Sequence, residues 1–276
     1  MGNKLKIAVI LAIAFTSCTK NKIFTGLNEM KDIPYGTNPR QKLDIYLPEQ
    51  YSKSTKVILL IHGGGWIMGN KEDNLVEASY LAHHGYVAAS MSYRYASNKE
   101  NIHYRALMED VGSAIQCILN KASALGFDSS GIALGGGSAG GHMALLYAYG
   151  YDSLKQVKAV ISMFGPTDIS ATDIHTIPGM GNLLAIMTGD TDKTHWADAN
   201  PMHFVNSACP PTILFHGKPD NVVPVSQSVK MHQALDDVSV PNQLVLFEKS
   251  GHGFNDADLK TTLEETVIFL GRYFHP

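Results

Sequence analysis

The prediction of the fold depends on residues 132–145, which read Ile132-Ala133-Leu134-Gly135-Gly136-Gly137-Ser138-Ala139-Gly140-Gly141-His142-Met143-Ala144-Leu145. They predict a short apolar strand, a glycine-rich turn that holds one serine, and a helix that begins with small residues. Gly136 to Gly140 fits the pattern G-x-S-x-G, which is typical of a sharp strand-to-helix turn that exposes a serine hydroxyl. A Cβ atom at Gly136 or Gly140 would collide with the neighbouring strand or helix. A flexible glycine loop is the alternative, so Ser138 needs partners elsewhere in the chain.

The composition indicates one folded domain. The chain has 276 residues, of which 45% are hydrophobic and 17% charged, so it can bury a large core, and a single α/β domain of this size is ordinary. The formal net charge of −3 gives no electrostatic reason to expect nucleic acid or an acidic membrane surface as a partner.

The first residues predict an export signal. Lys4 and Lys6 precede the apolar run 7–15, which is too short to cross a bilayer but suits the hydrophobic region of a secretory signal. Phe15-Thr16-Ser17-Cys18 resembles the lipobox of bacterial lipoproteins, in which the cysteine is lipidated. We therefore expect a signal peptide at 1–17, a tether and lead-in at 18–40, and an exported protein anchored to the membrane only through Cys18, in the periplasm or at the cell surface. The alternative is that Cys18 merely lies near a conventional cleavage site.

The other two cysteines, Cys117 and Cys209, are too few for a disulfide framework and lack C-x-x-C metal spacing. Cys117 lies on the apolar side of a predicted helix and is expected in the core, while Cys209 could pair with it or stay free. No metal or cofactor is expected.

Strands and helices alternate from residue 41 to the end of the chain. The apolar patterns predict strands at 41–48, 56–61, 86–93, 132–137, 157–164, 211–216 and 243–247, and helices at 75–84, 104–125, 139–145, 226–236 and 259–274. Residues 168–205 are irregular and are expected to form an insertion above the sheet. This order favours an α/β domain at 41–276, with a mostly parallel sheet, helices on both faces, and ligands at the carboxyl ends of the strands.

Two loops that follow strands carry the expected partners of Ser138. A serine hydroxyl becomes a good nucleophile when a histidine takes its proton and a carboxylate orients that histidine. Asp220 and His252 each lie just beyond a strand, and the chain order Ser, Asp, His is that of α/β-hydrolases. Glu248 is the rival carboxylate, but it lies only four residues before His252 and would have to curl back.

Three further histidines are expected to be structural. The chain contains 12 histidines, so each has a low prior chance of being catalytic. His62 and His216 close strands and are expected to form hydrogen bonds beneath the site, and His142 is expected to pack behind Ser138.

Acyl transfer also requires N–H donors that point at the developing oxyanion. The Gly63-Gly64-Gly65 amides can supply them, and Ala139 can supply another because its amide opens a helix and has no partner one turn back.

Together these motifs resemble α/β-hydrolases of the esterase and lipase kind, close to the hormone-sensitive-lipase-like group. The resemblance rests on Leu43 to Pro48, His62-Gly63-Gly64-Gly65-Trp66, the Ser138 turn, the Asp220 loop and Gly251-His252-Gly253-Phe254. It implies that Gly64 and Gly65 carry the oxyanion hole, and that the site is open and partly walled by Trp66 and the 168–205 insertion. The chain also resembles, more loosely, exported bacterial carbohydrate acetyl and feruloyl esterases.

These features predict a cofactor-free serine ester hydrolase that acts on short acyl esters, of a small molecule or a glycan. The acetyl or feruloyl glycan substrate follows from the export signal and the open site. The alternatives are a peptidase of the prolyl-oligopeptidase type, an amide hydrolase like kynurenine formamidase, and a non-catalytic binding module with this fold.

Overall fold

Eight strands form one sheet in the computed structural model, which describes residues 27–275. The order across the sheet is β1-β2-β4-β3-β5-β6-β7-β8. β1 pairs antiparallel with β2 and β2 with β4, whereas all other neighbours are parallel. The strands are β1 (Asn28–Pro34), β2 (Lys42–Leu47), β3 (Val57–Ile61), β4 (Val87–Ser92), β5 (Ile132–Gly137), β6 (Val157–Met163), β7 (Thr212–Gly217) and β8 (Asn242–Phe247). The predicted mostly parallel sheet is confirmed.

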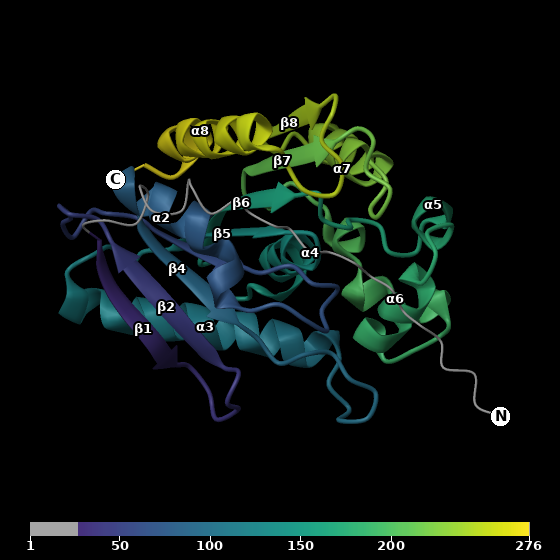
Figure 1. The fold of residues 1–276 in the computed structure, drawn as a ribbon, viewed down its shortest axis with the longest axis horizontal. Helices are drawn as coiled ribbons and strands as arrows, with labels where there is room; N and C mark the ends of the chain where they lie inside the picture. Colours follow the sequence, from purple (N-terminus) through teal and green to yellow (C-terminus); the bar gives the residue numbers. More distant parts are fainter. Residues whose placement is uncertain (1–26, 276) are drawn as a thin grey trace.

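Helices cover both faces of the sheet (Figure 1), with α2 and α8 on one face and α3 on the other. The α-helices are α2 (Leu75–His83), α3 (Tyr104–Leu125), α4 (Ala139–Leu146), α5 (Thr172–His175), α6 (Met180–Thr188), α7 (Ser226–Asp237) and α8 (Asp256–Tyr273). Short helices of other types are the 3-10 helices η1 (Lys71–Asn74), η3 (Lys193–His195), η4 (Ala197–Ala199) and η5 (Pro201–Phe204), and the π-helix η2 (Tyr147–Tyr151). Within residues 27–275, no helix is long and apolar enough to span a membrane.

The central strand β3 shows why its sequence is aliphatic throughout. Val57, Leu59 and Ile61 belong to the core cluster that includes the buried side chains of α3 and α4. Ile58 and Leu60 belong to the cluster under α2 and α8. Side chains alternate between the two faces of a strand, so a strand covered on both faces needs an apolar residue at every position.

Two segments of the chain contain elements that their sequence patterns do not reveal. Within the expected tether and lead-in at 18–40, Asn28–Pro34 form edge strand β1. Most side chains of β1 are exposed, so it lacks the apolar pattern of an inner strand. The predicted irregular segment 168–205 contains α5, α6 and η3 to η5, which are too short to show helical periodicity. In Figure 1, α5 and α6 lie beyond the ends of the β6 and β7 arrows.

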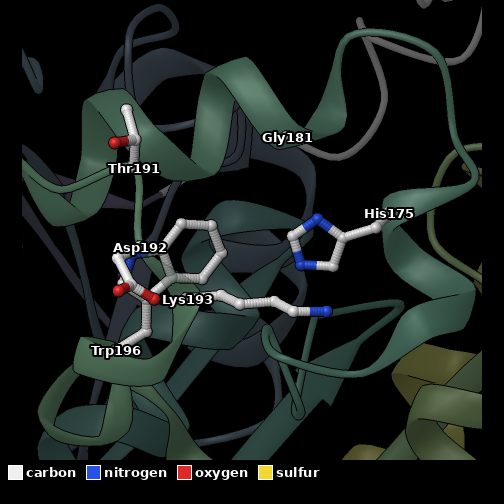
Figure 2. A pocket seen from close by; sticks show the side chains of 6 residues that line it. All are labelled: His175, Gly181, Thr191, Asp192, Lys193 and Trp196. Carbon is white, nitrogen blue, oxygen red and sulfur yellow. The ribbon is translucent and has the colours of Figure 1, made fainter.

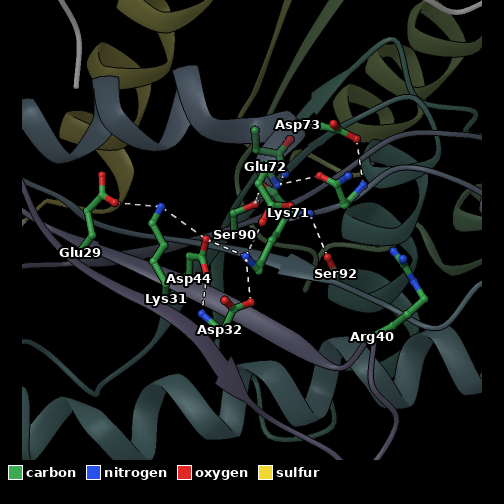
Figure 3. A network of polar contacts seen from close by, with 12 residues as sticks. Glu29, Lys31, Asp32, Arg40, Asp44, Lys71, Glu72, Asp73, Ser90 and Ser92 are labelled. Atoms are coloured by element: carbon green, nitrogen blue, oxygen red, sulfur yellow. Dashed lines mark hydrogen bonds and ion pairs between the residues drawn. The ribbon is translucent and has the colours of Figure 1, made fainter. Parts of the chain in front are cut away.

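A buried ion pair joins β2 to the turn η1 (Figure 3). Lys71 Nζ lies 3.0 Å from an Asp44 carboxylate oxygen, and their side chains are only 7% and 1% exposed. Asp44 also accepts the N–H of Asp32 in β1 at 2.8 Å. Lys71 N–H in turn donates to Ser92 Oγ at the end of β4. These contacts connect the edge of the sheet to the chain that follows the glycine motif at 63–65.

Candidate active site

Ser138 lies at the point where β5 turns into α4. Its backbone has φ 54° and ψ −121°, a strained conformation for a residue with a side chain. A Cβ atom at Gly136 would lie 2.5 Å from the Gly140 carbonyl carbon, and one at Gly140 would lie 2.0 Å from the Ile61 oxygen. The steric reason predicted for both glycines is confirmed.

The structure brings Ser138, His252 and Asp220 into one hydrogen-bonded chain. Ser138 Oγ lies 2.9 Å from His252 Nε2, and His252 Nδ1 lies 2.9 Å from Asp220 Oδ2. An ionised carboxylate only accepts hydrogen bonds, so Nδ1 carries the proton and Nε2 is free to accept the Ser138 O–H. This is the arrangement in which an imidazole can remove the proton of a serine as it attacks a carbonyl carbon.

Asp220 is held ionised by its surroundings. Its side chain is fully buried, and its Oδ1 accepts the N–H groups of Val222 and Val223 at 2.8 and 2.9 Å. Burial by itself raises the pKa of the carboxyl group, but hydrogen bonds from His216 and His252 outweigh it and hold the pKa well below its usual value. Asp220 therefore remains an acceptor for His252 at any pH near neutrality.

His216 lies beneath the site, as predicted. Its Nε2 is 2.9 Å from the Val223 carbonyl oxygen and 3.2 Å from Asp220 Oδ2. A carbonyl oxygen only accepts, so Nε2 carries a proton, and Nδ1 accepts the hydroxyl of Ser228 at 2.8 Å. His216 thus helps to orient Asp220 through Oδ2, the same oxygen that His252 contacts.

The rival carboxylate, Glu248, points away from the site. Its side chain is 72% exposed and pairs with Lys218. The loops that carry Asp220 and His252 approach each other closely at Gly217. A Cβ atom at this position would lie 1.9 Å from the Ser250 backbone oxygen, so only glycine allows this approach.

The glycine motif after β3 leaves its amide groups free. Gly64 and Gly65 have φ values of +103° and +57°, which favour glycine. Within residues 27–275, the N–H groups of Gly64, Gly65 and Ala139 donate to no protein atom. A Cβ atom at the preceding Gly63 would lie 3.5 Å from Ser138 Cβ, so the motif begins directly beside the serine. These amides are suitable donors for an oxyanion.

Backbone carbonyl groups of the same loop, by contrast, accept hydrogen bonds from side chains. The Tyr93 hydroxyl contacts the oxygens of His62 and Gly63 at 3.2 and 3.3 Å. Arg40 Nη2 and the Tyr95 hydroxyl both donate to the Gly69 oxygen, at 2.8 and 2.6 Å. Satisfied carbonyls fix the loop with its free N–H groups in place. Arg40, Tyr93 and Tyr95 are not recognisable as supports of this loop from the sequence, since nothing in their local pattern indicates these contacts.

Trp66 requires a correction. It was expected to wall the open site, but it is only 1% exposed, so it lies in the core and cannot bind substrate there. Its indole Nε1 donates to His142 Nδ1 at 3.2 Å. The glycines before Trp66 turn the chain back, and the backbone at Trp66 has φ 63°, which directs the ring inward. His142 is 1% exposed and packs behind Ser138 as predicted.

Phe164 is a site residue that the sequence did not reveal. It follows β6 and has φ 43°, which is unfavourable for a bulky aromatic residue. Its ring lies edge-on to the His252 ring at 4.8 Å between centroids, and a Cβ atom at Gly137 would lie 3.3 Å from it. Strain of this kind is typical of positions near a reacting centre.

The insertion carries a separate pocket of about 510 Å³ (Figure 2). Its lining residues are His175, Gly181, Thr191, Asp192, Lys193 and Trp196, and none of them belongs to the hydrogen-bonded chain of Ser138.

Cys117 is half-buried rather than fully in the core, and both Cys117 and Cys209 are free thiols. Within residues 27–275, no group of three or more His, Cys, Asp or Glu side chains could hold a metal ion.

A family model described as BD-FAE matches residues 43–235. The chain belongs to the BD-FAE family. The match includes Ser138 and Asp220, and the resemblance to α/β-hydrolase esterases is confirmed.

Known proteins of this fold are similar over most of the chain. A Bacteroides eggerthii structure titled "Bifunctional GH43-CE" has a TM-score of 0.77 and 28% identity, and the match covers 88% of this chain and 38% of that one. Thermogutta terrifontis esterase 2, in a structure phosphonylated by sarin, has a TM-score of 0.76 and 26% identity, with 90% and 95% covered. These similarities show the α/β-hydrolase fold.

Among curated proteins, the isoprenylcysteine alpha-carbonyl methylesterase ICME of Arabidopsis thaliana is 29% identical over 241 residues. The match covers 80% of this chain and 56% of the relative. The chain thus spans little more than half the length of this curated relative.

Proposed function

We propose that the chain is a serine ester hydrolase that cleaves short acyl esters through a covalent acyl-enzyme. The observation that carries this proposal is the chain from Ser138 Oγ to His252 to buried Asp220, with both distances at 2.9 Å. The BD-FAE match supports it, as does the similarity to an esterase that sarin phosphonylates, because organophosphates react with activated serines.

In the first half of the reaction, Ser138 Oγ attacks the ester carbonyl carbon while His252 Nε2 takes the hydroxyl proton. Asp220 stabilises the resulting imidazolium without accepting its proton. The negative oxygen of the tetrahedral intermediate is bound by the free N–H groups of Gly64, Gly65 and Ala139. Collapse of the intermediate breaks the bond to the alkoxide, which leaves with the proton from His252.

In the second half, water attacks the acyl group on Ser138 and His252 takes a proton from that water. The second tetrahedral intermediate uses the same three amides. When it collapses, His252 returns the proton to Ser138 Oγ, and the carboxylic acid is released.

We propose acetyl or aromatic acyl groups on glycans as the substrate class. The support is the BD-FAE family, which comprises carbohydrate and feruloyl esterases, and the similarity to a chain titled "Bifunctional GH43-CE". A panel of acetylated xylan, methyl ferulate and an isoprenylcysteine methyl ester tests this choice. Preference for the isoprenylcysteine methyl ester would contradict the glycan substrate class but would leave the proposed ester hydrolysis unchanged.

Hydrolysis of p-nitrophenyl acetate tests the proposed activity. The wild-type chain should hydrolyse it, and Ser138→Ala should lower kcat by about 10⁴-fold or more with the fold retained by circular dichroism. Unchanged turnover in the variant would contradict the proposal. Turnover of a proline p-nitroanilide but of no ester would favour the peptidase alternative.

We also propose that the protein is exported and anchored through a lipid on Cys18. The support is the run of residues 4–18 in the sequence, all of which lie outside the described residues. Mass spectrometry of the mature N-terminus should find an acylated Cys18. A mature chain that begins at another residue without a lipid would contradict the anchor.

A further inference from the structure

Two buried side chains connect the glycine loop to the helix that begins beside Ser138. Trp66 Nε1 lies 3.2 Å from His142 Nδ1, and the two rings meet edge to face at 85° with centroids 5.2 Å apart. Each residue is only 1% exposed. Trp66 directly follows the glycine motif, and the backbone N–H of His142 donates to the backbone carbonyl oxygen of Ser138 in the first turn of α4. The hydrogen bond between Trp66 and His142 therefore connects the residue after the glycine motif to the first turn of the helix that begins beside Ser138.

The other ring nitrogen of His142 reaches the insertion. Nε2 lies 2.9 Å from the oxygen of Ala199 in η4. Since a carbonyl oxygen only accepts, Nε2 carries the proton and Nδ1 is the acceptor for the Trp66 N–H. Burial lowers the pKa of His142 to about 4, although the bond to Ala199 opposes the shift, so the imidazole stays neutral and keeps one donor and one acceptor.

The position of Trp66 is constrained on its other side as well. Its backbone oxygen accepts the N–H of Ala96 at 2.9 Å, and its backbone has φ 63°. A residue with positive φ persists only where surrounding contacts determine it. Loss of the bond to His142 would remove the contact that fixes the indole and would let residues 64–66 relax.

We propose that His142 is a positioning residue, which acts through Trp66 to set the Gly64 and Gly65 amides relative to Ser138. This inference rests on the proposed function, in which those amides bind the oxyanion. A displacement of such donors by a fraction of their hydrogen-bond length weakens the transition state more than substrate binding, so the effect falls on kcat.

The test compares four variants by p-nitrophenyl acetate kinetics at a temperature well below their unfolding midpoints. His142→Leu and Trp66→Phe each remove one partner, and each should lower kcat about tenfold or more with KM changed less than about threefold. The double variant should be no slower than the slower single variant, because both changes break the same bond. His142→Gln should recover activity to within about threefold of wild type, because the side-chain amide offers an acceptor oxygen for the Trp66 N–H and an N–H donor for the Ala199 oxygen.

The matched control is Tyr149→Phe. Tyr149 is 6% exposed, and its hydroxyl makes a 2.7 Å hydrogen bond to Thr212 at the start of β7, the end opposite the site. This variant should lower the unfolding temperature without changing kcat. The kcat of Tyr149→Phe shows how much of a decrease in kcat results from the loss of any buried hydrogen bond.

Three outcomes would overturn the inference: an unchanged kcat in folded His142→Leu or Trp66→Phe, losses that multiply in the double variant, or a His142→Gln variant as slow as His142→Leu. If His142→Leu does not fold, the kcat values of Trp66→Phe and His142→Gln still test whether His142 is a positioning residue. A wild-type chain without esterase activity would overturn the proposed function instead, so the two failures are distinguishable.

Discussion

At the scale of single residues, two carboxylates compete for the role of partner to His252. Asp220 is fully buried and lies 2.9 Å from Nδ1, whereas Glu248 is 72% exposed and pairs with Lys218. A carboxylate stabilises an imidazolium best when it is close, desolvated and kept ionised by other donors. Only Asp220 satisfies these conditions.

Asp220→Asn should therefore lower kcat by on the order of 10³-fold or more, because the amide can hold the wrong tautomer of His252 and cannot stabilise its positive charge. Glu248→Gln is the matched control and should stay within about twofold of wild type. Steady-state kinetics with p-nitrophenyl acetate measure both. A large loss of kcat in Glu248→Gln together with normal kcat in Asp220→Asn would show that Glu248, and not Asp220, is the partner of His252.

At the scale of elements, the sequence predicted what is periodic or sterically determined. β3 is recognisable because it is apolar at every position, and the Ser138 turn because two of its glycines admit no Cβ atom. β1 escaped prediction because an exposed edge strand has little apolar pattern. The inward direction of Trp66 also escaped prediction, because it depends on a positive φ and on a partner 76 residues away.

The ion pair between β2 and η1 is an element-scale contact that neither local pattern predicts. Asp44→Asn would remove the buried carboxylate beside the Lys71 ammonium, which would keep only the exposed carboxylates of Glu72 and Asp32 as partners. We expect a loss of about 1 to 3 kcal/mol in the free energy of unfolding. Lys31→Ala is the control, since Lys31 pairs with Asp44 at 3.5 Å from a side chain that is 40% exposed, and it should cost less than about 1 kcal/mol. Urea denaturation measures both.

Equal losses in the two variants would contradict this account of the pair. If kcat of folded Asp44→Asn also falls, the pair contributes to the position of the glycine loop that precedes η1.

At the scale of the whole molecule, stability is coupled to pH through two neutral histidines beneath the site. Burial lowers the pKa values of His62 and His142 to about 4. His62 Nδ1 is 2.7 Å from the Gly63 oxygen, and its Nε2 has no hydrogen-bond partner within residues 27–275. In the unfolded chain, both imidazoles would titrate near pH 6.5.

Between about pH 6.5 and 4, these two imidazoles therefore bind more protons in the unfolded chain than in the folded one, which lowers the free energy of unfolding as the pH falls. Glu77, whose pKa burial raises to about 7, acts in the opposite direction and offsets part of this slope. Each imidazole contributes a slope of up to about 1.4 kcal/mol per pH unit. Urea denaturation at several pH values in this window measures the slope. His142→Gln removes one of the two groups and should have a shallower slope, whereas a slope equal to that of wild type would contradict the account.

The central claim is that Ser138 is the nucleophile of a covalent ester hydrolase. Its most direct test is peptide mass mapping after reaction with a fluorophosphonate, followed in parallel by the loss of p-nitrophenyl acetate hydrolysis. We predict one adduct, on Ser138, that grows in proportion to the loss of activity and is absent from Ser138→Ala. Complete inactivation with the adduct on another residue, or an active chain that the reagent leaves unlabelled at Ser138, would contradict the claim.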